Sequence, residues 1–201
     1  MEAVKSNGYI LLNIPEEFKD YKLCFKSIQQ NGLNLEFVPK KLMDYNMCLE
    51  AVKEKGYSLR YVPEEYRSYD LFLEAVKQYG YALNSIPKEL IDYTMCLEGV
   101  KKDGNSLYYV PEEYKDYNLC LEAVKQNGNS LSYVPEELID YNLCLEAVKQ
   151  NGYSLYYVPE SFQDYNLYSE AVKQKGSVLQ FIPEKLRDYD LCLEAVKQNG
   201  N

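Results

Sequence analysis

Cysteine is the residue of this chain with the most reactive side chain, and its spacing is regular. The six cysteines share one position of a 24-residue pattern: Cys24, Cys48, Cys96, Cys120, Cys144 and Cys192. A column of thiolates could bind zinc, but no Cys-x-x-Cys spacing and no histidine accompanies it. Helices stacked about 8–10 Å apart would also hold successive cysteines beyond the roughly 7 Å between Cα atoms that a disulfide allows. Phe72 and Tyr168 take the same position in the two remaining copies, so packing in the interior is the favoured interpretation.

The glutamate pairs are the second candidate for chemistry. They directly follow prolines, as Glu16/Glu17, Glu64/Glu65, Glu112/Glu113 and Glu136/Glu137, and two neighbouring carboxylates can form an acid–base pair. Because the pairs recur, we interpret them as charges at helix N-termini. The chain has no histidine, which excludes the commonest general base and the Ser-His and Cys-His nucleophile systems. We therefore expect no enzyme activity, no metal site and no cofactor.

An internal repeat of 24 residues must position all these side chains. Proline begins each copy, at Pro15, Pro39, Pro63, Pro87, Pro111, Pro135, Pro159 and Pro183, and glycine recurs in the same register from Gly8 to Gly200. A fixed period between 20 and 50 residues indicates supersecondary units that stack and share a core. The sequence predicts a single repeat domain over residues 1–201.

One copy, Pro111 to Val134, predicts two helices. Proline suits the first position of a helix, so a short helix of about six residues is expected to start at Pro111. Asp116 is expected to cap a second helix through about Asn127, which Gly128 ends in the left-handed conformation. The predicted interior stripe of this helix consists of Tyr117, Cys120, Leu121 and Val124.

The connection from Gly128 to Val134 leaves an alternative open. Its apolar alternation would suit a short strand, which would give an α/β horseshoe like that of leucine-rich repeats. The longer Leu-x-x-Leu-x-Leu run of those repeats is missing, however. We favour an all-α fold, an α-solenoid of about eight 24-residue helix-turn-helix repeats.

The repeat also resembles a known family. Glu-Ala-Val-Lys-Gln-Asn-Gly at residues 122–128, followed by Leu131, Val134-Pro135, Leu138 and Asp140, is similar to a short repeat described as a domain of unknown function. That family occurs in effector-like proteins of intracellular bacteria and in large DNA viruses. The resemblance covers the whole chain, implies an all-α solenoid and assigns no catalytic residue.

The charge of the chain narrows the classes of partner. There are 22 Lys+Arg against 31 Asp+Glu, a net charge of −9, which disfavours nucleic acid and anionic membrane surfaces. The early apolar run, residues 9–12, is too short for a signal peptide or a membrane span. We expect a cytoplasmic protein, or one in the host cytosol if it is a secreted effector.

Tyrosine is abundant, with 22 residues, and its positions are of two kinds. One column follows the capping position and is predicted to pack structurally with its hydroxyl at the rim: Tyr21, Tyr45, Tyr69, Tyr93, Tyr117, Tyr141, Tyr165 and Tyr189. Other positions change between copies, as ordinary loop residues or binding residues do. Because Tyr and Arg are enriched at interface hot spots, the predicted partner surface consists of Tyr57, Arg60, Tyr81, Tyr108, Tyr153 and Tyr156.

The leading functional hypothesis is a non-enzymatic repeat scaffold for a protein or peptide. The alternative is a structural spacer or self-assembling rod without a specific ligand. A third hypothesis is a repeat segment of a larger effector or enzyme. Neither end shows the polar capping copy that solenoids use, so the chain is expected to be a segment, with end-to-end self-association as the alternative.

Overall fold

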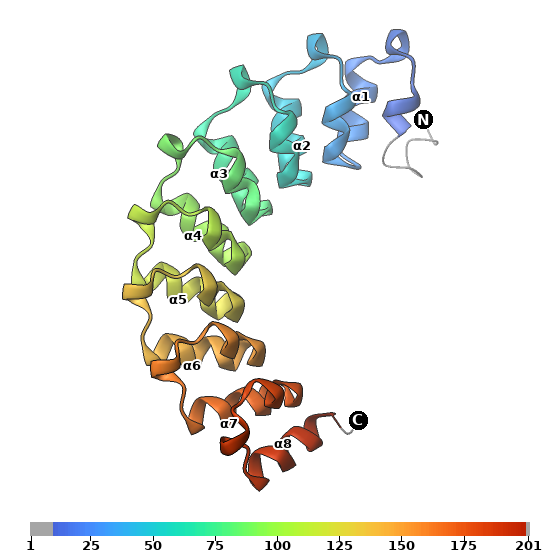
Figure 1. Ribbon diagram of the computed structural model, residues 1–201. Coiled ribbons are helices and arrows are strands. Elements are labelled where there is room, and N and C mark those ends of the chain that lie inside the picture. Colours follow the sequence, from blue (N-terminus) through green and yellow to red (C-terminus); the bar gives the residue numbers. More distant parts are fainter. Residues whose placement is uncertain (1–9, 200–201) are drawn as a thin grey trace. The chain divides into compact units, whose positions relative to one another are not determined.

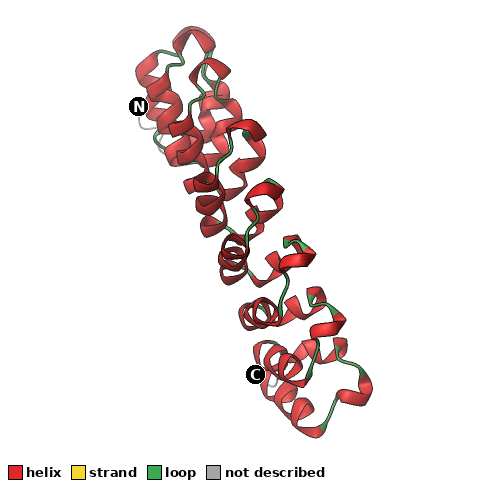
Figure 2. Cartoon of the chain, turned by 90° about the vertical axis from the view of Figure 1, so that its left-hand side faces the viewer, coloured by secondary structure: helices red, strands yellow, loops and turns green. Residues whose placement is uncertain are grey.

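The computed structural model describes residues 10–199. Contacts between Cα atoms divide the chain into an N-terminal unit, Met1–Lys102, and a C-terminal unit, Asp103–Asn201. Every regular element in the described part is helical, and Figure 2 shows no strand there. The all-α repeat fold is therefore confirmed, and the strand alternative for the connection is wrong. The predicted continuity of one solenoid over residues 1–201 stays a prediction.

Each copy of the repeat contributes one α-helix. In the N-terminal unit these are α1 (Tyr21–Ile28), α2 (Tyr45–Glu54), α3 (Tyr69–Gln78) and α4 (Tyr93–Lys102). In the C-terminal unit they are α5 (Tyr117–Gln126), α6 (Tyr141–Gln150), α7 (Tyr165–Gln174) and α8 (Tyr189–Asn199). Figure 1 shows that the α-helices lie side by side within each unit, and each contacts its neighbour there.

The rest of each copy forms two kinds of 3₁₀-helix. The long ones have six residues: η4 (Gly32–Phe37), η6 (Gly56–Tyr61), η8 (Gly80–Ser85), η10 (Gly104–Tyr109), η12 (Gly128–Tyr133), η14 (Gly152–Tyr157) and η16 (Gly176–Phe181). The short ones have three: η3 (Glu16–Phe18), η5 (Lys40–Leu42), η7 (Glu64–Tyr66), η9 (Lys88–Leu90), η11 (Glu112–Tyr114), η13 (Glu136–Leu138), η15 (Glu160–Phe162) and η17 (Glu184–Leu186). A further one, η2 (Ile10–Asn13), comes first among the described residues.

The α-helices and the long 3₁₀-helices form two adjoining rows within each unit. Helix α6, for example, contacts η12 before it and η14 after it, and η12 also contacts η14. The residues of α5 that this arrangement buries are Leu119, Cys120, Ala123 and Val124. The predicted stripe was therefore partly wrong, because Tyr117 and Leu121 are only half-buried and Leu119 is interior.

The predicted start of the α-helix is confirmed. The Asp116 carboxylate accepts a hydrogen bond from the backbone N–H of Leu119 at 2.8 Å, as an N-cap residue does. The helix from Pro111 is shorter than predicted, because only Glu112–Tyr114 are helical and Pro111 itself is extended with ψ 142°. Asp116, which caps the next helix, is also extended, with φ −91° and ψ 170°. Only one helical turn therefore fits between Pro111 and Asp116.

The predicted role of Gly128 as a left-handed helix end is wrong. No residue of the described range has a positive φ, and Gly128 instead begins η12. A Cβ atom on Gly128 would lie 2.2 Å from the carbonyl oxygen of Ala147 in α6. Glycine is needed here because two backbone segments of adjacent copies touch.

Candidate binding surface

The predicted contact residues of the N-terminal unit lie on two long 3₁₀-helices. Tyr57 and Arg60 are exposed on η6, and Tyr81 is half-buried on η8. The Arg60 guanidinium lies 4.9 Å from the centre of the Tyr57 ring and also donates a hydrogen bond to the Tyr57 hydroxyl. It lies 5.5 Å from the ring of Tyr61 as well. This is a cation–π contact at the protein surface.

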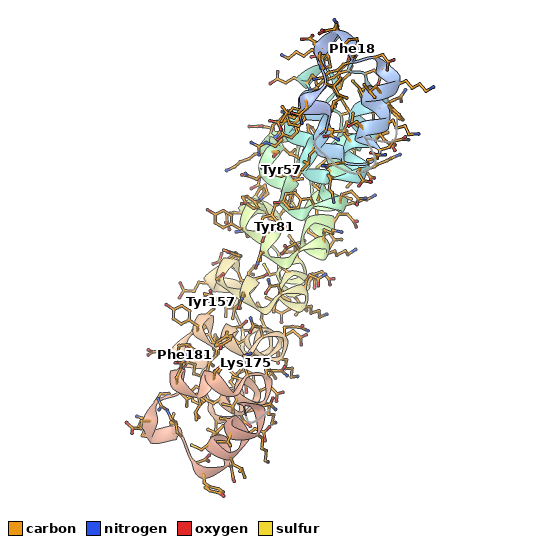
Figure 3. The ribbon with its side chains drawn as sticks, turned by 90° about the vertical axis from the view of Figure 1, so that its right-hand side faces the viewer. Phe18, Tyr57, Tyr81, Tyr157, Lys175 and Phe181 are labelled. Carbon is orange, nitrogen blue, oxygen red and sulfur yellow. The ribbon has the colours of Figure 1, made fainter. Side chains whose placement is uncertain are left out.

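Tyr79 joins Tyr57 to Tyr81. The rings of Tyr57 and Tyr79 meet edge to face with centroids 5.7 Å apart, and the Tyr79 and Tyr81 centroids are 5.5 Å apart. Figure 3 shows Tyr57 and Tyr81 in adjacent copies of the repeat on the face towards the viewer. Tyr79 is not among the predicted contact residues, although its replacement of the usual asparagine before glycine was a signal.

A surface pocket of about 190 Å³ adjoins these rings. Its lining residues are Glu54, Lys55, Gly56, Tyr57, Gln78 and Tyr79. Two of them, Lys55 and Tyr79, occupy the N-cap position of a long 3₁₀-helix and make no side-chain capping bond. In other copies that bond is made at 3.0–3.1 Å by Asn31, Asp103, Asn127 and Asn151. The pocket therefore forms where two adjacent copies have Lys55 and Tyr79 in place of the usual Asn or Asp cap.

Two of the three predicted contact residues of the C-terminal unit, Tyr108 and Tyr156, are more exposed than Tyr57. The exposed fractions are 62% for Tyr108 on η10 and 75% for Tyr156 on η14, and Tyr153 is also exposed. The ring of Tyr108 meets those of Tyr109 and Tyr133 edge to face at 5.0 and 5.3 Å.

The copy that contains η14 also places an exposed tyrosine against a second aromatic ring. Tyr156 meets Tyr157 edge to face at 5.3 Å, and Tyr153 lies 6.3 Å from Phe181. The Tyr153 hydroxyl also lies 2.7 Å from that of Ser177. Each predicted residue of this unit thus contacts a second aromatic ring.

The aromatic residues that contact Tyr108, Tyr153 and Tyr156 share one position of the repeat, two residues before its proline. In the sequence this position belongs to the apolar connection before the proline, and none of its residues was predicted as a contact residue. We name its members in the C-terminal unit the aromatic row: Tyr109, Tyr133, Tyr157 and Phe181. Figure 3 shows Tyr157 and Phe181 on the same side of adjacent copies.

The other tyrosine column is part of the repeat interface. The hydroxyl of Tyr69 donates to the carboxylate of Asp92 at 2.8 Å, and that of Tyr117 lies 3.3 Å from each carboxylate oxygen of Asp140. The hydrogen bond to Asp92 raises the pKa of Tyr69, and burial followed by the charge of Asp140 raises the pKa of Tyr117. These contacts support the predicted structural role.

The cysteine column is interior, as predicted. Five of the six thiols are buried and Cys192 is half-buried. Burial raises the pKa of Cys48 to about 12 and those of Cys120 and Cys144 to about 11, so these thiols stay protonated and unreactive. Within residues 10–199, no three Cys, Asp or Glu side chains lie together in a group that could hold a metal ion. Within the same range, no helix has both the length and the apolar character to cross a membrane.

The comparison with protein families gave one result. The profile of a family described as a domain of unknown function (DUF4116) matches residues 1–43, 44–91, 92–139, 116–163, 140–187 and 164–201. Residues 44–91 span 48 positions, so a full match covers two copies of the 24-residue repeat. Neither the curated proteins nor the solved structures gave a match.

Proposed function

The chain belongs to this DUF4116 repeat family, and we propose that it is a non-enzymatic scaffold that binds a protein or peptide through exposed aromatic side chains of its long 3₁₀-helices. The proposal includes no cofactor and no catalytic residue. The predicted contact residues Tyr57, Arg60, Tyr81, Tyr108, Tyr153 and Tyr156 belong to this surface.

The observation that carries the proposal is the exposure of Tyr108 and Tyr156. Both are at the same position of the repeat, where Ser132 stands in the copy between them. The fold does not require an aromatic side chain at this position, because the copy between them has a serine there and forms the same helices. Large exposed aromatic side chains that the interior does not use are typical of contact residues at interfaces.

The compartment and the excluded partners are part of the proposal. The net charge of −9 supports a partner other than nucleic acid or an anionic membrane. The cytoplasm is the proposed location, or the host cytosol if the chain is secreted, as the resemblance to repeats of bacterial effector-like and large-virus proteins implies.

Selection of binders from a displayed library of random peptides tests the proposal. The wild-type chain should select a recurring peptide motif, and the double variant Tyr108→Ala/Tyr156→Ala should lose those peptides. Ser132→Ala is the matched control, since it truncates an exposed side chain at the same repeat position. If wild type selects no motif, or the double variant retains every binder, the scaffold proposal fails and a structural spacer is favoured.

A further inference from the structure

The aromatic row is continuous in the C-terminal unit and interrupted in the N-terminal one. Four consecutive copies carry Tyr109, Tyr133, Tyr157 and Phe181. In the N-terminal unit the residues at the same position are Asn13, Phe37, Tyr61 and Ser85, so only two of the four are aromatic. Tyr109 and Tyr133 are half-buried, whereas Tyr157 and Phe181 have exposed fractions of 38% and 47%. The C-terminal unit thus presents an aromatic side chain at every copy.

The interval between these rings follows from helix packing. Helices α5 to α8 contact one another in sequence, and so do η10, η12, η14 and η16. Packed helices lie about 8–10 Å apart, so the row repeats at about that interval.

One peptide conformation has the same period. A polyproline II helix rises about 3.1 Å per residue with three residues per turn, which places every third residue on one side at about 9.3 Å. A β-strand repeats a face at about 6.6 Å, since alternate side chains point to opposite sides. An α-helix returns to nearly the same face every seven residues, at about 10.5 Å. The polyproline II period is the one that falls within the interval of the row.

Charge is also unevenly distributed between the units. Residues 103–201 contain 16 Asp+Glu and 8 Lys+Arg, a net charge of −8, whereas residues 1–102 contain 15 and 14 and carry −1. Electrostatic complementarity favours a positively charged partner for the C-terminal unit.

We propose that the aromatic row binds a proline-rich peptide segment in the polyproline II conformation, with a proline at every third residue and basic side chains between. The inference rests on the proposed scaffold function and specifies the partner of its C-terminal unit. Aromatic-lined surfaces receive the rings of such peptides, which are already extended and lose little conformational entropy on binding. Tyr108 and Tyr156 stand beside the row, and their hydroxyl groups can donate to peptide carbonyl oxygens.

The test uses three synthetic peptides. Each peptide has twelve residues, because three peptide residues are expected to span one of the four copies. The first repeats Pro-Ala-Lys, the second has the same composition with irregularly spaced prolines, and the third repeats Pro-Ala-Glu. Titration calorimetry on the whole chain measures their affinities. The Pro-Ala-Lys peptide should bind about tenfold more tightly than either of the others. Equal binding of the regular and irregular peptides would overturn the inference, as would preference for the acidic peptide.

Variants of the row locate the site. Tyr133→Ala should weaken binding of the Pro-Ala-Lys peptide about fivefold, while Tyr133→Phe, which keeps the ring, should retain it. Tyr61→Ala changes the same repeat position in the N-terminal unit and should leave the affinity unchanged. Circular dichroism melts identify any variant that has lost its fold, and Tyr157→Ala at the more exposed position then replaces Tyr133→Ala. Unchanged affinity in a folded row variant would contradict the site.

The two proposals fail in different ways. If random peptides are selected in a manner that depends on Tyr108 and Tyr156 but none of the proline peptides binds, only the inference about the partner is wrong. If the wild-type chain selects no motif from the library, the scaffold proposal itself is wrong, and the inference about its partner is wrong with it.

Discussion

The hydroxyl of Tyr69 in α3 donates a hydrogen bond to Asp92 Oδ2 at 2.8 Å, while Asp92 Oδ1 accepts the backbone N–H of Met95 in α4 at 2.8 Å. One carboxylate therefore caps a helix and also holds the preceding α-helix against it. The pairs Tyr117–Asp140 and Tyr141–Asp164 repeat the contact in the C-terminal unit.

Replacing Asp92 should separate its two roles. Asp92→Ala removes the cap and the acceptor of Tyr69, and we expect it to lower the free energy of unfolding by about 1 kcal/mol or slightly more. Asp92→Asn is the matched control, because asparagine caps helices as well as aspartate. Its amide nitrogen would take the place of Oδ2 and donate to the Tyr69 hydroxyl, so the contact between the two helices is kept without the charge. Urea unfolding followed by circular dichroism measures both. Equal losses in the two variants would show that the charge, and not the cap, matters.

A side chain at Gly128 should disrupt the contact between adjacent copies. The Cβ atom of Gly128→Ala would lie 2.2 Å from the Ala147 carbonyl oxygen, a backbone atom that moves only with its helix. We expect a loss of about 1–3 kcal/mol, as for other overpacked sites. Thermal and urea unfolding give this value, and an unchanged stability would contradict the close approach.

Gly99→Ala provides the contrasting case, because this glycine is inside α4 at a position where α1 has Ser27 and the other α-helices have alanine. Its Cβ atom would lie 2.8 Å from Leu83 Cδ1, the end of a flexible side chain. Alanine favours a helix over glycine by about 1 kcal/mol, so we expect a gain in stability of up to that amount. A loss larger than about 1 kcal/mol would show that Leu83 has no room to move.

Two buried serines at one repeat position should respond differently to truncation. Ser154 Oγ donates to Asn129 Oδ1 of the preceding copy at 3.2 Å, whereas Ser58 Oγ is buried without a hydrogen-bond partner. In the copy before Ser58, the residue equivalent to Asn129 is Leu33, whose side chain cannot accept a hydrogen bond. We expect Ser154→Ala to cost about 1 kcal/mol and Ser58→Ala to be neutral or stabilising. The same loss in both variants would mean that Ser58 is hydrogen-bonded.

Alkaline pH should destabilise the protein through its buried thiols. The pKa of Cys48 is about 12 in the fold against an ordinary value of 9.0, so the folded state retains a proton that the unfolded state loses. This stabilising contribution is complete below pH 9 and is lost as the pH rises towards 12. Urea unfolding under reducing conditions between pH 8 and 10.5 should show falling stability. Cys48→Ala should reduce the slope, and an unchanged slope would assign the effect to other groups.

Sequence alone determined the period of the repeat, the all-helical fold and the capping aspartates. These features are local: Asp116 has the right neighbours to cap α5, and Cys120 has an apolar equivalent in every other copy. The exposure of Tyr108 and Tyr156 was also predictable, because variation between otherwise identical copies marks positions that the interior does not constrain.

The tertiary structure alone decided what each recurring residue contacts in the next copy. Gly128 looked like a helix end because the sequence cannot show that Ala147, 19 positions away, brings its carbonyl oxygen against it. The sequence likewise shows that Tyr109 and Tyr133 are equivalent, but they are 24 residues apart and become neighbouring positions only when η10 packs on η12. Periodicity specifies which residues are equivalent, whereas packing between copies specifies which of them meet.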